Sequence, residues 1–169
     1  MDIKQTNKKW YAVYTKSRNE KKVNELLAEK GIESYLPLQK TLKQWSDRKK
    51  FVEEPLFRSY IFVRIDYKHH IDVLQTQGVV TFVKFAGKPE PVPDKQIEAV
   101  KMLLAENYDF EVTNENLKIG DKVEVTQGAM KGLQGELVEY RGKKKVVIRI
   151  DTIGQNLLVD IPAAYVRIL

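Results

Sequence analysis

The chain contains no cysteine and only two histidines in 169 residues. Without cysteine it can form neither a disulfide framework nor a thiolate metal site. His69 and His70 are adjacent at the start of a predicted helix, where sequence neighbours do not share a face. We therefore interpret them as surface or half-buried side chains rather than a metal pair. We expect no metal and no other cofactor.

Long hydrophobic runs are also missing. No apolar stretch approaches the roughly 20 residues that a helix needs to cross a bilayer. The first ten residues are polar and lysine-bearing, which is not typical of a secretory signal. These absences predict a cytoplasmic protein without a membrane partner.

The sequence also lacks the common catalytic motifs. It has neither a Walker-type Gly-rich loop ending in Lys-Ser/Thr nor a Gly-x-Ser-x-Gly elbow. Its carboxylates are plentiful but do not gather on one predicted face. Because a reaction needs positioned acids, bases or nucleophiles, we expect no catalytic residue and no enzymatic activity.

The composition that is present predicts a folded, basic protein. Hydrophobic residues make up 43% of the chain, which is enough for a packed core. The net charge is +6 and the pI is about 9.3. Residues 1–105 carry 20 basic and 13 acidic side chains, whereas residues 106–116 carry four acids and no base. A basic domain suits contact with a polyanion, although ordinary soluble proteins share this property.

The first part of the chain has a mixed α/β pattern. β-Branched and aromatic residues favour strands, and apolar residues on one helical stripe favour helices. Asp94 is the expected N-cap of the last helix. Residues 39–50 are polar and basic and predict an exposed hairpin or loop. We expect the 55–65 strand to be central, because large apolar residues occupy both of its faces. The expected strands span 10–15, 34–37, 55–65 and 79–85, and the expected helices span 18–30, 67–77 and 94–105.

The last part of the chain is predicted to be all β. Gly128, Gly132 and Gly135 allow tight turns between alternating apolar segments. Many β-branched residues and scattered glycines favour strands over a helical hairpin. A closed barrel would remove exposed strand edges. The expected strands span 122–126, 134–140, 144–151, 156–161 and 165–168, and the domains 8–105, an acidic linker 106–116 and 117–169.

Four motifs in this order resemble the NusG family of transcription elongation factors. They are Trp10–Tyr14, Pro55–Val63, Gly78–Phe85 and the glycine-rich Val123–Val138 segment, which resembles a KOW motif. The resemblance implies an α+β fold: an N-terminal antiparallel sheet flanked by helices (NGN-like), then a small SH3-like β-barrel. Arg58-Ser59 replaces the Pro-Gly of housekeeping members, so the chain looks closer to specialised, RfaH-like paralogues.

The resemblance implies that an apolar depression on the N-terminal domain receives the clamp helices of RNA polymerase. Aromatic residues suit such a surface because they dominate interface energetics. The alternative is that these side chains are ordinary core residues. The positions that match the polymerase-binding surface are Tyr14, Phe57, Tyr60, Phe62 and Phe85.

Two basic clusters are candidates for contact with DNA or RNA in the elongation complex. Lysine and arginine bind phosphates, and a nearby aromatic ring can stack on a base. The alternative is a solvated charged surface. The first cluster contains Lys16, Arg18, Lys21 and Lys22, and the second contains Lys40, Lys43, Trp45, Arg48, Lys49 and Lys50.

The resemblance also implies a partner for the barrel. Ile153 and Gly154 occupy the loop where general elongation factors carry a phenylalanine before the glycine. The isoleucine puts binding of Rho in doubt and weakens, without removing, the expectation of a ribosomal-protein partner. We expect a monomeric elongation and antitermination factor that binds the polymerase clamp and suppresses pausing or termination. The alternative function is a KOW-type RNA-binding or ribosome-associated protein without polymerase affinity.

Overall fold

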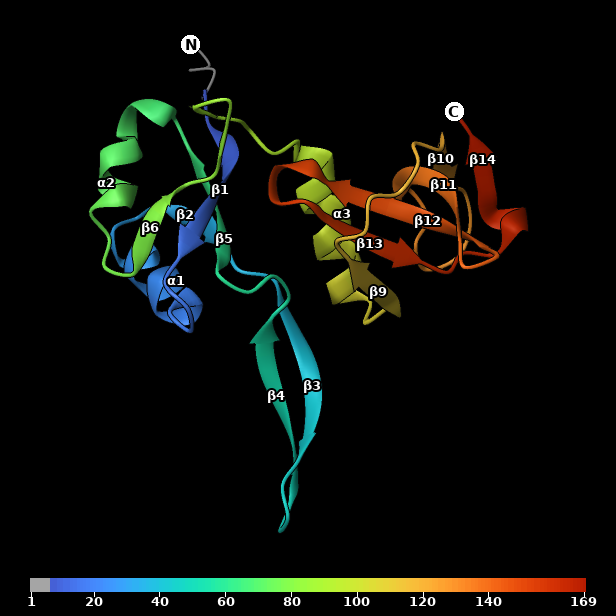
Figure 1. Ribbon diagram of the computed structural model, residues 1–169, viewed down its shortest axis with the longest axis horizontal. Helices are drawn as coiled ribbons and strands as arrows, with labels where there is room; N and C mark the ends of the chain where they lie inside the picture. Colours follow the sequence, from blue (N-terminus) through green and yellow to red (C-terminus); the bar gives the residue numbers. More distant parts are fainter. Residues whose placement is uncertain (1–6) are drawn as a thin grey trace, which may run out of the picture. The chain divides into compact units, whose positions relative to one another are not determined.

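The computed structural model describes residues 7–169 of the chain (Figure 1). Contacts divide the chain into two compact units, one ending at Val92 and one beginning at Pro93. The predicted boundary between residues 105 and 106 therefore differs from the observed one. Helix α3 (Asp94–Ala105) lies against strand β12 (Lys143–Ile150) of the second unit, which accounts for the earlier boundary.

The N-terminal unit contains the predicted antiparallel sheet and helices. Its main sheet has the strand order β2-β5-β1-β6, so β5 is central, as the sequence predicted. The strands are β1 (Lys9–Thr15), β2 (Glu33–Tyr35), β5 (Tyr60–Ile65) and β6 (Val79–Phe82), with the short pair β7 (Lys84–Phe85) and β8 (Lys88–Pro89) following. The helices are α1 (Glu20–Glu29), the 3-10 turn η1 (Tyr67–His69) and α2 (His70–Leu74).

Alternation along the strands gives the main sheet two distinct faces. Tyr11 and Val13 of β1 lie in one core cluster with Ile61 and Val63 of β5 and with side chains of the helices, including Val23. The opposite face carries Trp10, Ala12 and Tyr14, paired across the strands with Arg64, Phe62 and Tyr60. The helices thus cover one face, and the other face carries the family-matched aromatic residues.

The predicted 55–65 strand is interrupted. Strand β4 (Lys49–Pro55) ends at the proline, and β5 begins only at Tyr60. Ser59 has φ 66, a left-handed conformation that strands do not contain and that non-glycine residues rarely adopt. The family's glycine at this position would adopt it without steric cost.

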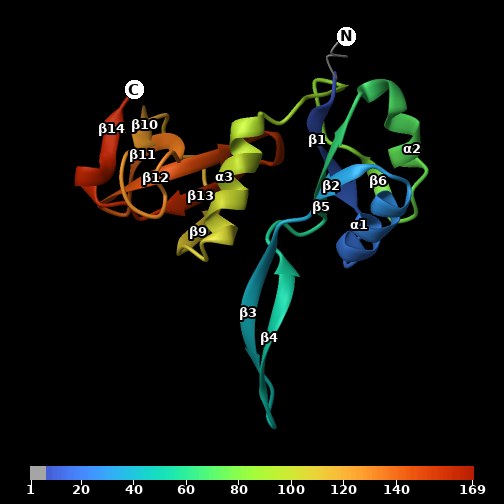
Figure 2. The same cartoon turned by 180° about the vertical axis from the view of Figure 1, so that it is seen from behind.

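Residues 39–50 form the predicted exposed hairpin. Strand β3 (Leu38–Gln44) pairs with β4 in register from Leu38–Pro55 to Gln44–Lys49. The hairpin extends away from the main sheet in both ribbon views (Figures 1 and 2). It is anchored at its base, where Leu38 packs on the core cluster and the Leu56 N–H donates to the Pro37 carbonyl at 2.9 Å.

The C-terminal unit is a strand-rich sheet preceded by α3. The strand order is β14-β10-β11-β12-β13-β9, with every neighbouring pair antiparallel. The predicted strand 134–140 is confirmed as β11, and the other predicted strands fall within one or two residues of the observed ends. The remaining strands are β9 (Phe110–Thr113), β10 (Asp121–Val125), β13 (Gln155–Val159) and β14 (Val166–Ile168), with 3-10 turns η2 (Asp151–Ile153) and η3 (Ala163–Tyr165).

Two sequence-based expectations are corrected here. The acidic segment 106–116 is not only a linker, because β9 within it pairs with β13 from Phe110–Val159 to Thr113–Asn156. Asp94 does not cap α3 either. Pro93 occupies the cap position without a side-chain hydrogen bond, and Asp94 is the first helical residue, where its charge still favours the helix dipole.

The glycines of the KOW-like segment serve two different purposes. Gly132 has φ 95, which supports the prediction of a tight turn there. Gly135, by contrast, lies within β11, and a β-carbon on it would approach the Val147 carbonyl oxygen to 2.6 Å. Gly135 is therefore required for close approach of β11 and β12 rather than for a turn. Over residues 7–169, no helix is long and apolar enough to cross a membrane.

Candidate functional site

Tyr14 and Tyr60 form the accessible centre of the family-matched surface. They lie directly opposite each other on β1 and β5, with ring centroids 4.9 Å apart. Tyr14 is 37% exposed and Tyr60 is half-buried. The pKa of the Tyr60 hydroxyl is raised to about 12, mainly by burial and secondly by a hydrogen bond with Tyr14. The Tyr60 hydroxyl therefore stays protonated over the physiological pH range, and the pair offers an aromatic surface that carries hydroxyl groups.

Phe57 and Phe62 lie beside this pair but are buried. Phe62 has no exposed surface and Phe57 is only 4% exposed. Their rings meet edge to face with centroids 6.3 Å apart. As the chain is folded here, these two residues support the surface through packing and do not present side chains to a partner.

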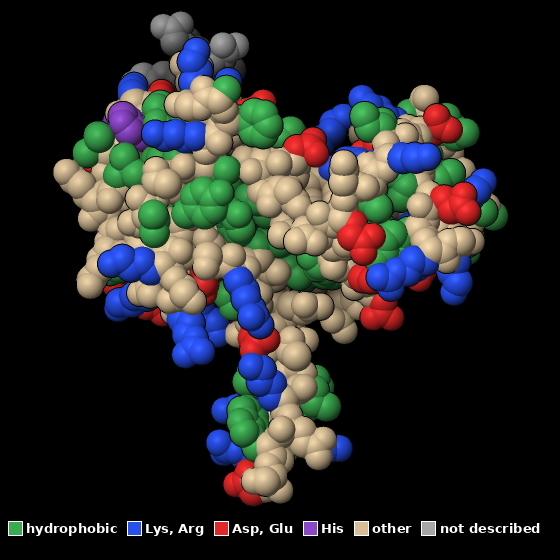
Figure 3. Space-filling view, in the orientation of Figure 1, with side chains coloured by type: hydrophobic (Ala, Val, Ile, Leu, Met, Phe, Trp, Pro, Cys, Tyr) green, Lys and Arg blue, Asp and Glu red, His purple; other side chains and the backbone are tan. Residues whose placement is uncertain are grey.

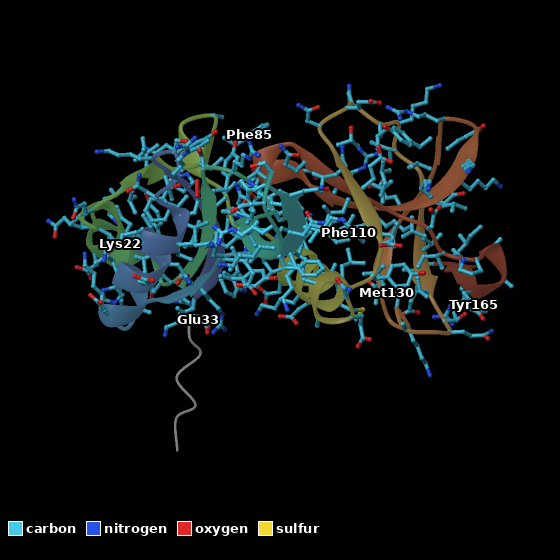
Figure 4. The ribbon with its side chains drawn as sticks, turned by 90° about the horizontal axis from the view of Figure 1, so that it is seen from below. Lys22, Glu33, Phe85, Phe110, Met130 and Tyr165 are labelled. Carbon is cyan, nitrogen blue, oxygen red and sulfur yellow. The ribbon has the colours of Figure 1, made fainter. Side chains whose placement is uncertain are left out.

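Phe85 is separate from the other four aromatic residues. It belongs to the two-residue strand β7 and is 67% exposed. Its ring, labelled in Figure 4, makes no contact with the rings of the other four residues. The structure thus brings Tyr14, Phe57, Tyr60 and Phe62 together and leaves Phe85 as a solitary exposed ring.

A buried carboxylate that sequence reasoning missed holds the edge of this surface. Glu20, at the start of α1, is 6% exposed. Its Oε1 accepts hydrogen bonds from the backbone N–H of Arg18 at 3.1 Å and of Ser59 at 3.2 Å. Both donor residues have a left-handed backbone conformation, with φ 64 at Arg18 and φ 66 at Ser59. Glu20 therefore ties the loop of the first basic cluster to the turn before Tyr60, and no local sequence motif signals this pairing.

The first basic cluster surrounds that loop. Lys16, Arg18 and Lys22 are exposed, and Lys22 lies 3.9 Å from Glu25 on the same helix. Lys21 has a structural partner, because its ammonium donates to the Glu53 carbonyl of β4 at 2.6 Å. The cluster is thus adjacent in space to the base of the β3–β4 hairpin, a proximity that the sequence did not reveal.

The second basic cluster occupies the hairpin and its turn. The Arg48 guanidinium lies 5.4 Å from the centroid of the Trp45 ring, within cation–π range. Lys43 forms an ion pair with Glu54, and their hydrogen bond is the main reason that the pKa of Glu54 is lowered. Basic and hydrophobic side chains both lie along the hairpin in Figure 3. Lys40, Lys49 and Lys50 are exposed as well.

The predicted partner loop of the C-terminal unit is only partly available. Gly154 is exposed and left-handed, with φ 63, whereas Ile153 is 7% exposed. Ile153 is therefore a core residue of its unit. Of the two loop residues, only Gly154 is exposed to a partner.

The histidine pair has an ordinary local role. The His70 ring stacks on Tyr67 with centroids 4.5 Å apart, and its Nδ1 lies 2.9 Å from the Tyr67 carbonyl oxygen. Within the described part of the chain, no three His, Asp or Glu side chains are grouped to hold a metal ion.

Comparisons with known proteins agree with the fold. A family model described as "Transcription termination factor nusG" matches residues 8–101. The "Transcription termination/antitermination protein NusG" of Streptococcus pyogenes serotype M1 is 26% identical and covers 92% of this chain and 93% of that protein. The Staphylococcus carnosus protein of the same name is 27% identical, with 91% and 92% covered.

One solved structure is similar to this chain over nearly its whole length. The structure entitled "Domain interaction in Thermotoga maritima NusG" matches with a TM-score of 0.51 and 25% sequence identity. The match covers 96% of this chain and 97% of the other. With a family model spanning more than half of its residues, the chain belongs to the NusG family of transcription termination and antitermination factors.

Proposed function

We propose that this NusG-family protein binds the clamp of RNA polymerase through the Tyr14–Tyr60 surface and suppresses pausing or termination. The observation that carries the proposal is the paired, accessible tyrosines on the sheet face opposite the helices. Tyrosine is enriched in interface hot spots because it buries large area while its hydroxyl can still hydrogen-bond. Phe57 and Phe62 would stabilise the surface from beneath.

The exposed cations of the first basic cluster would contact nucleic acid near the bound polymerase. Lys16, Arg18 and Lys22 lie on the loop and helix that Glu20 joins to the Tyr60 turn. Phosphate contact of this kind is independent of sequence and sensitive to salt. Lys21 would contribute less, because its ammonium is already bonded to the Glu53 carbonyl.

A role at particular transcription units, as in RfaH-like paralogues, is part of the proposal. Its support is the Arg58-Ser59 pair, which departs from the Pro-Gly of housekeeping members and places a non-glycine residue at φ 66. Transcript profiling of a deletion strain should then show changes confined to a few transcription units. Changes across most transcripts would indicate a general factor instead.

The test of polymerase binding uses the full chain and purified core enzyme. Tyr14→Ala and Tyr60→Ala should each weaken binding by more than 1 kcal/mol, the scale of interface hot spots. Ile119→Ala, which truncates a side chain that is 89% exposed in the other unit, is the matched control. Wild-type protein that binds RNA but not core polymerase would instead support the RNA-binding or ribosome-associated alternative.

A further inference from the structure

The β3–β4 hairpin presents large apolar side chains to solvent on a small, projecting element. Leu42 is 51% exposed, Trp45 42% and Phe51 67%. A two-stranded hairpin is marginally stable by itself, so three exposed apolar residues within ten positions are a liability unless a ligand covers them. This concentration points to a binding element.

The pairing register sorts these side chains between the two faces of the hairpin. Leu42 lies opposite Phe51, and Lys43 lies opposite Lys50. Because neighbouring residues alternate between faces, the Leu42–Phe51 pair and the Lys43–Lys50 pair lie on opposite sides. Trp45 begins the turn. Its backbone N–H donates to the Arg48 carbonyl at 2.8 Å, and its ring lies against the Arg48 guanidinium.

The charge at the end of the hairpin selects an anionic ligand. Residues 42–51 carry four basic side chains and one acidic side chain. Lys43 is paired with Glu54, but within residues 7–169 the ammonium groups of Lys49 and Lys50 have no ion pair or hydrogen bond. Like charges directly opposite each other, as at Lys43 and Lys50, are unfavourable in a sheet, and Glu54 offsets this repulsion through Lys43 alone.

We propose that the hairpin end binds an unpaired polynucleotide strand, with bases stacked on Phe51 and Trp45 and phosphates bound by Lys49, Lys50 and Arg48. Exposed aromatic rings interleaved with cations are the usual means of binding single strands without reading sequence. Stacking and phosphate contact use features that RNA and DNA share, so the strand can carry either sugar. A duplex hides its base faces and would bind only through phosphates. This site goes beyond the proposed polymerase surface and needs no polymerase.

The experiment measures binding of fluorescent oligo-U and oligo-dT of about 12 nucleotides, a typical single-strand site size, to the full chain. Trp45 also supplies an intrinsic signal, because it is 42% exposed whereas Trp10, the other tryptophan, is 5% exposed. Stacking should quench the Trp45 emission. Both oligonucleotides should bind with similar affinity, and a duplex of equal length should bind at least tenfold more weakly.

Matched variants separate stacking from hydrophobic contact. Phe51→Leu and Trp45→Leu keep apolar side chains but lose the aromatic faces, so each should weaken binding by about tenfold or more. Phe51→Tyr and Trp45→Phe keep a ring and should bind within about threefold of the wild type, since stacking tolerates ring identity. Fluorescence anisotropy of the labelled strand gives the affinity for every variant.

The salt dependence tests the phosphate contacts. Lys49→Gln and Lys50→Gln should each reduce the slope of log affinity against log salt by about 0.7, the value for a single-strand phosphate contact. Lys143→Gln and Lys144→Gln, at exposed positions of β12, are the controls and should leave the slope unchanged. Circular dichroism and thermal unfolding confirm that each variant is folded.

Three results would overturn the site: no binding of either oligonucleotide, equally tight binding of the duplex, or Leu variants that bind like the wild type. A strong preference for oligo-U or for oligo-dT would contradict the proposal that RNA and DNA bind the site equally. Binding of core polymerase is measured separately on the same variants. Loss of the hairpin site with intact polymerase binding would therefore leave the proposed function standing.

Discussion

At the scale of single residues, the candidate surface depends on which aromatic rings are exposed. Periodicity predicts that residues of β5 are apolar on both faces, and this is confirmed by the burial of Ile61 and Phe62. It could not distinguish Tyr60, which remains half-exposed, from Phe62, which is buried, because both sit on the same face of one strand. Burial depends on what covers each end of the strand, and a local pattern carries no information on that.

Tyr60 should be among the last tyrosines to ionise. Its pKa is raised from 10.0 to about 12, so the folded state disfavours tyrosinate. The resulting stabilisation is complete below pH 10 and is lost as the pH rises from about 10 to about 12. A titration followed by near-ultraviolet tyrosinate absorbance should show a late step that Tyr60→Phe removes. Burial also raises the pKa of Tyr11, so Tyr11→Phe is the companion control. A late step that persists in both variants would contradict the assignment.

Glu20→Ala should destabilise the N-terminal unit by about 1–3 kcal/mol per N–H left without an acceptor. The N–H groups of Arg18 and Ser59 would lose their shared carboxylate. Urea unfolding gives the free energy, and amide hydrogen exchange at the two positions shows whether the loss is local. Glu25→Ala removes an exposed carboxylate of the same helix and should cost under about 0.5 kcal/mol. Equal losses of stability in the two variants would mean that Glu20 does not hold the two segments together.

At the scale of secondary-structure elements, local sequence patterns predicted the helices and strands correctly where the segments that pair are near each other in sequence. Helix α3 was predicted to within one residue of its observed bounds, and β11 and β12 were predicted as consecutive strands, which a turn at Arg141-Gly142 joins, with positive φ at both residues. Strand β9 was missed because its partner β13 lies more than 40 residues later. The break before β5 was missed because the Ser59 conformation depends on a hydrogen bond to Glu20, 39 positions away.

The β3–β4 hairpin should be removable without unfolding its domain. Replacing residues 42–51 with an Asn-Gly turn would keep Leu38 on the core cluster and the Lys21–Glu53 hydrogen bond. We expect the free energy of unfolding to change by less than about 1 kcal/mol, because the hairpin end contributes no residue to the core cluster. Chemical denaturation of the two proteins provides the measurement. A much larger loss would show that the hairpin is part of the domain core.

At the scale of the whole chain, two criteria give different extents for the first domain. The family model extends to residue 101, whereas the compact unit ends at Val92. Helix α3 accounts for the difference, since it lies against β12 and buries Ile97, Val100 and Leu103. The sequence predicted the helix and grouped it with the first domain, whereas its contacts are with β12, because an apolar stripe does not say which surface it packs on.

A fragment of residues 93–169 should therefore be more stable than a fragment of residues 117–169. The shorter fragment lacks α3 and β9, and each fully buried aliphatic side chain of α3 contributes about 1.5–3 kcal/mol. Thermal unfolding of both fragments gives the comparison. Leu103→Ala should lower the stability of the longer fragment toward that of the shorter one. Glu98→Ala, at an exposed position of the same helix, should leave it unchanged. Fragments of equal stability would mean that α3 packs on this sheet too weakly to matter.

The pairing of β9 with β13 and of β10 with β14 also sets the order in which the chain can fold during synthesis. Every strand of the N-terminal unit lies before residue 92, so that unit can complete its sheet early. The C-terminal sheet is complete only after Val166–Ile168 has been synthesised and has paired with β10. Since domains fold as units as they emerge, we expect nascent chains to carry a finished first domain while the second is still an open set of strands.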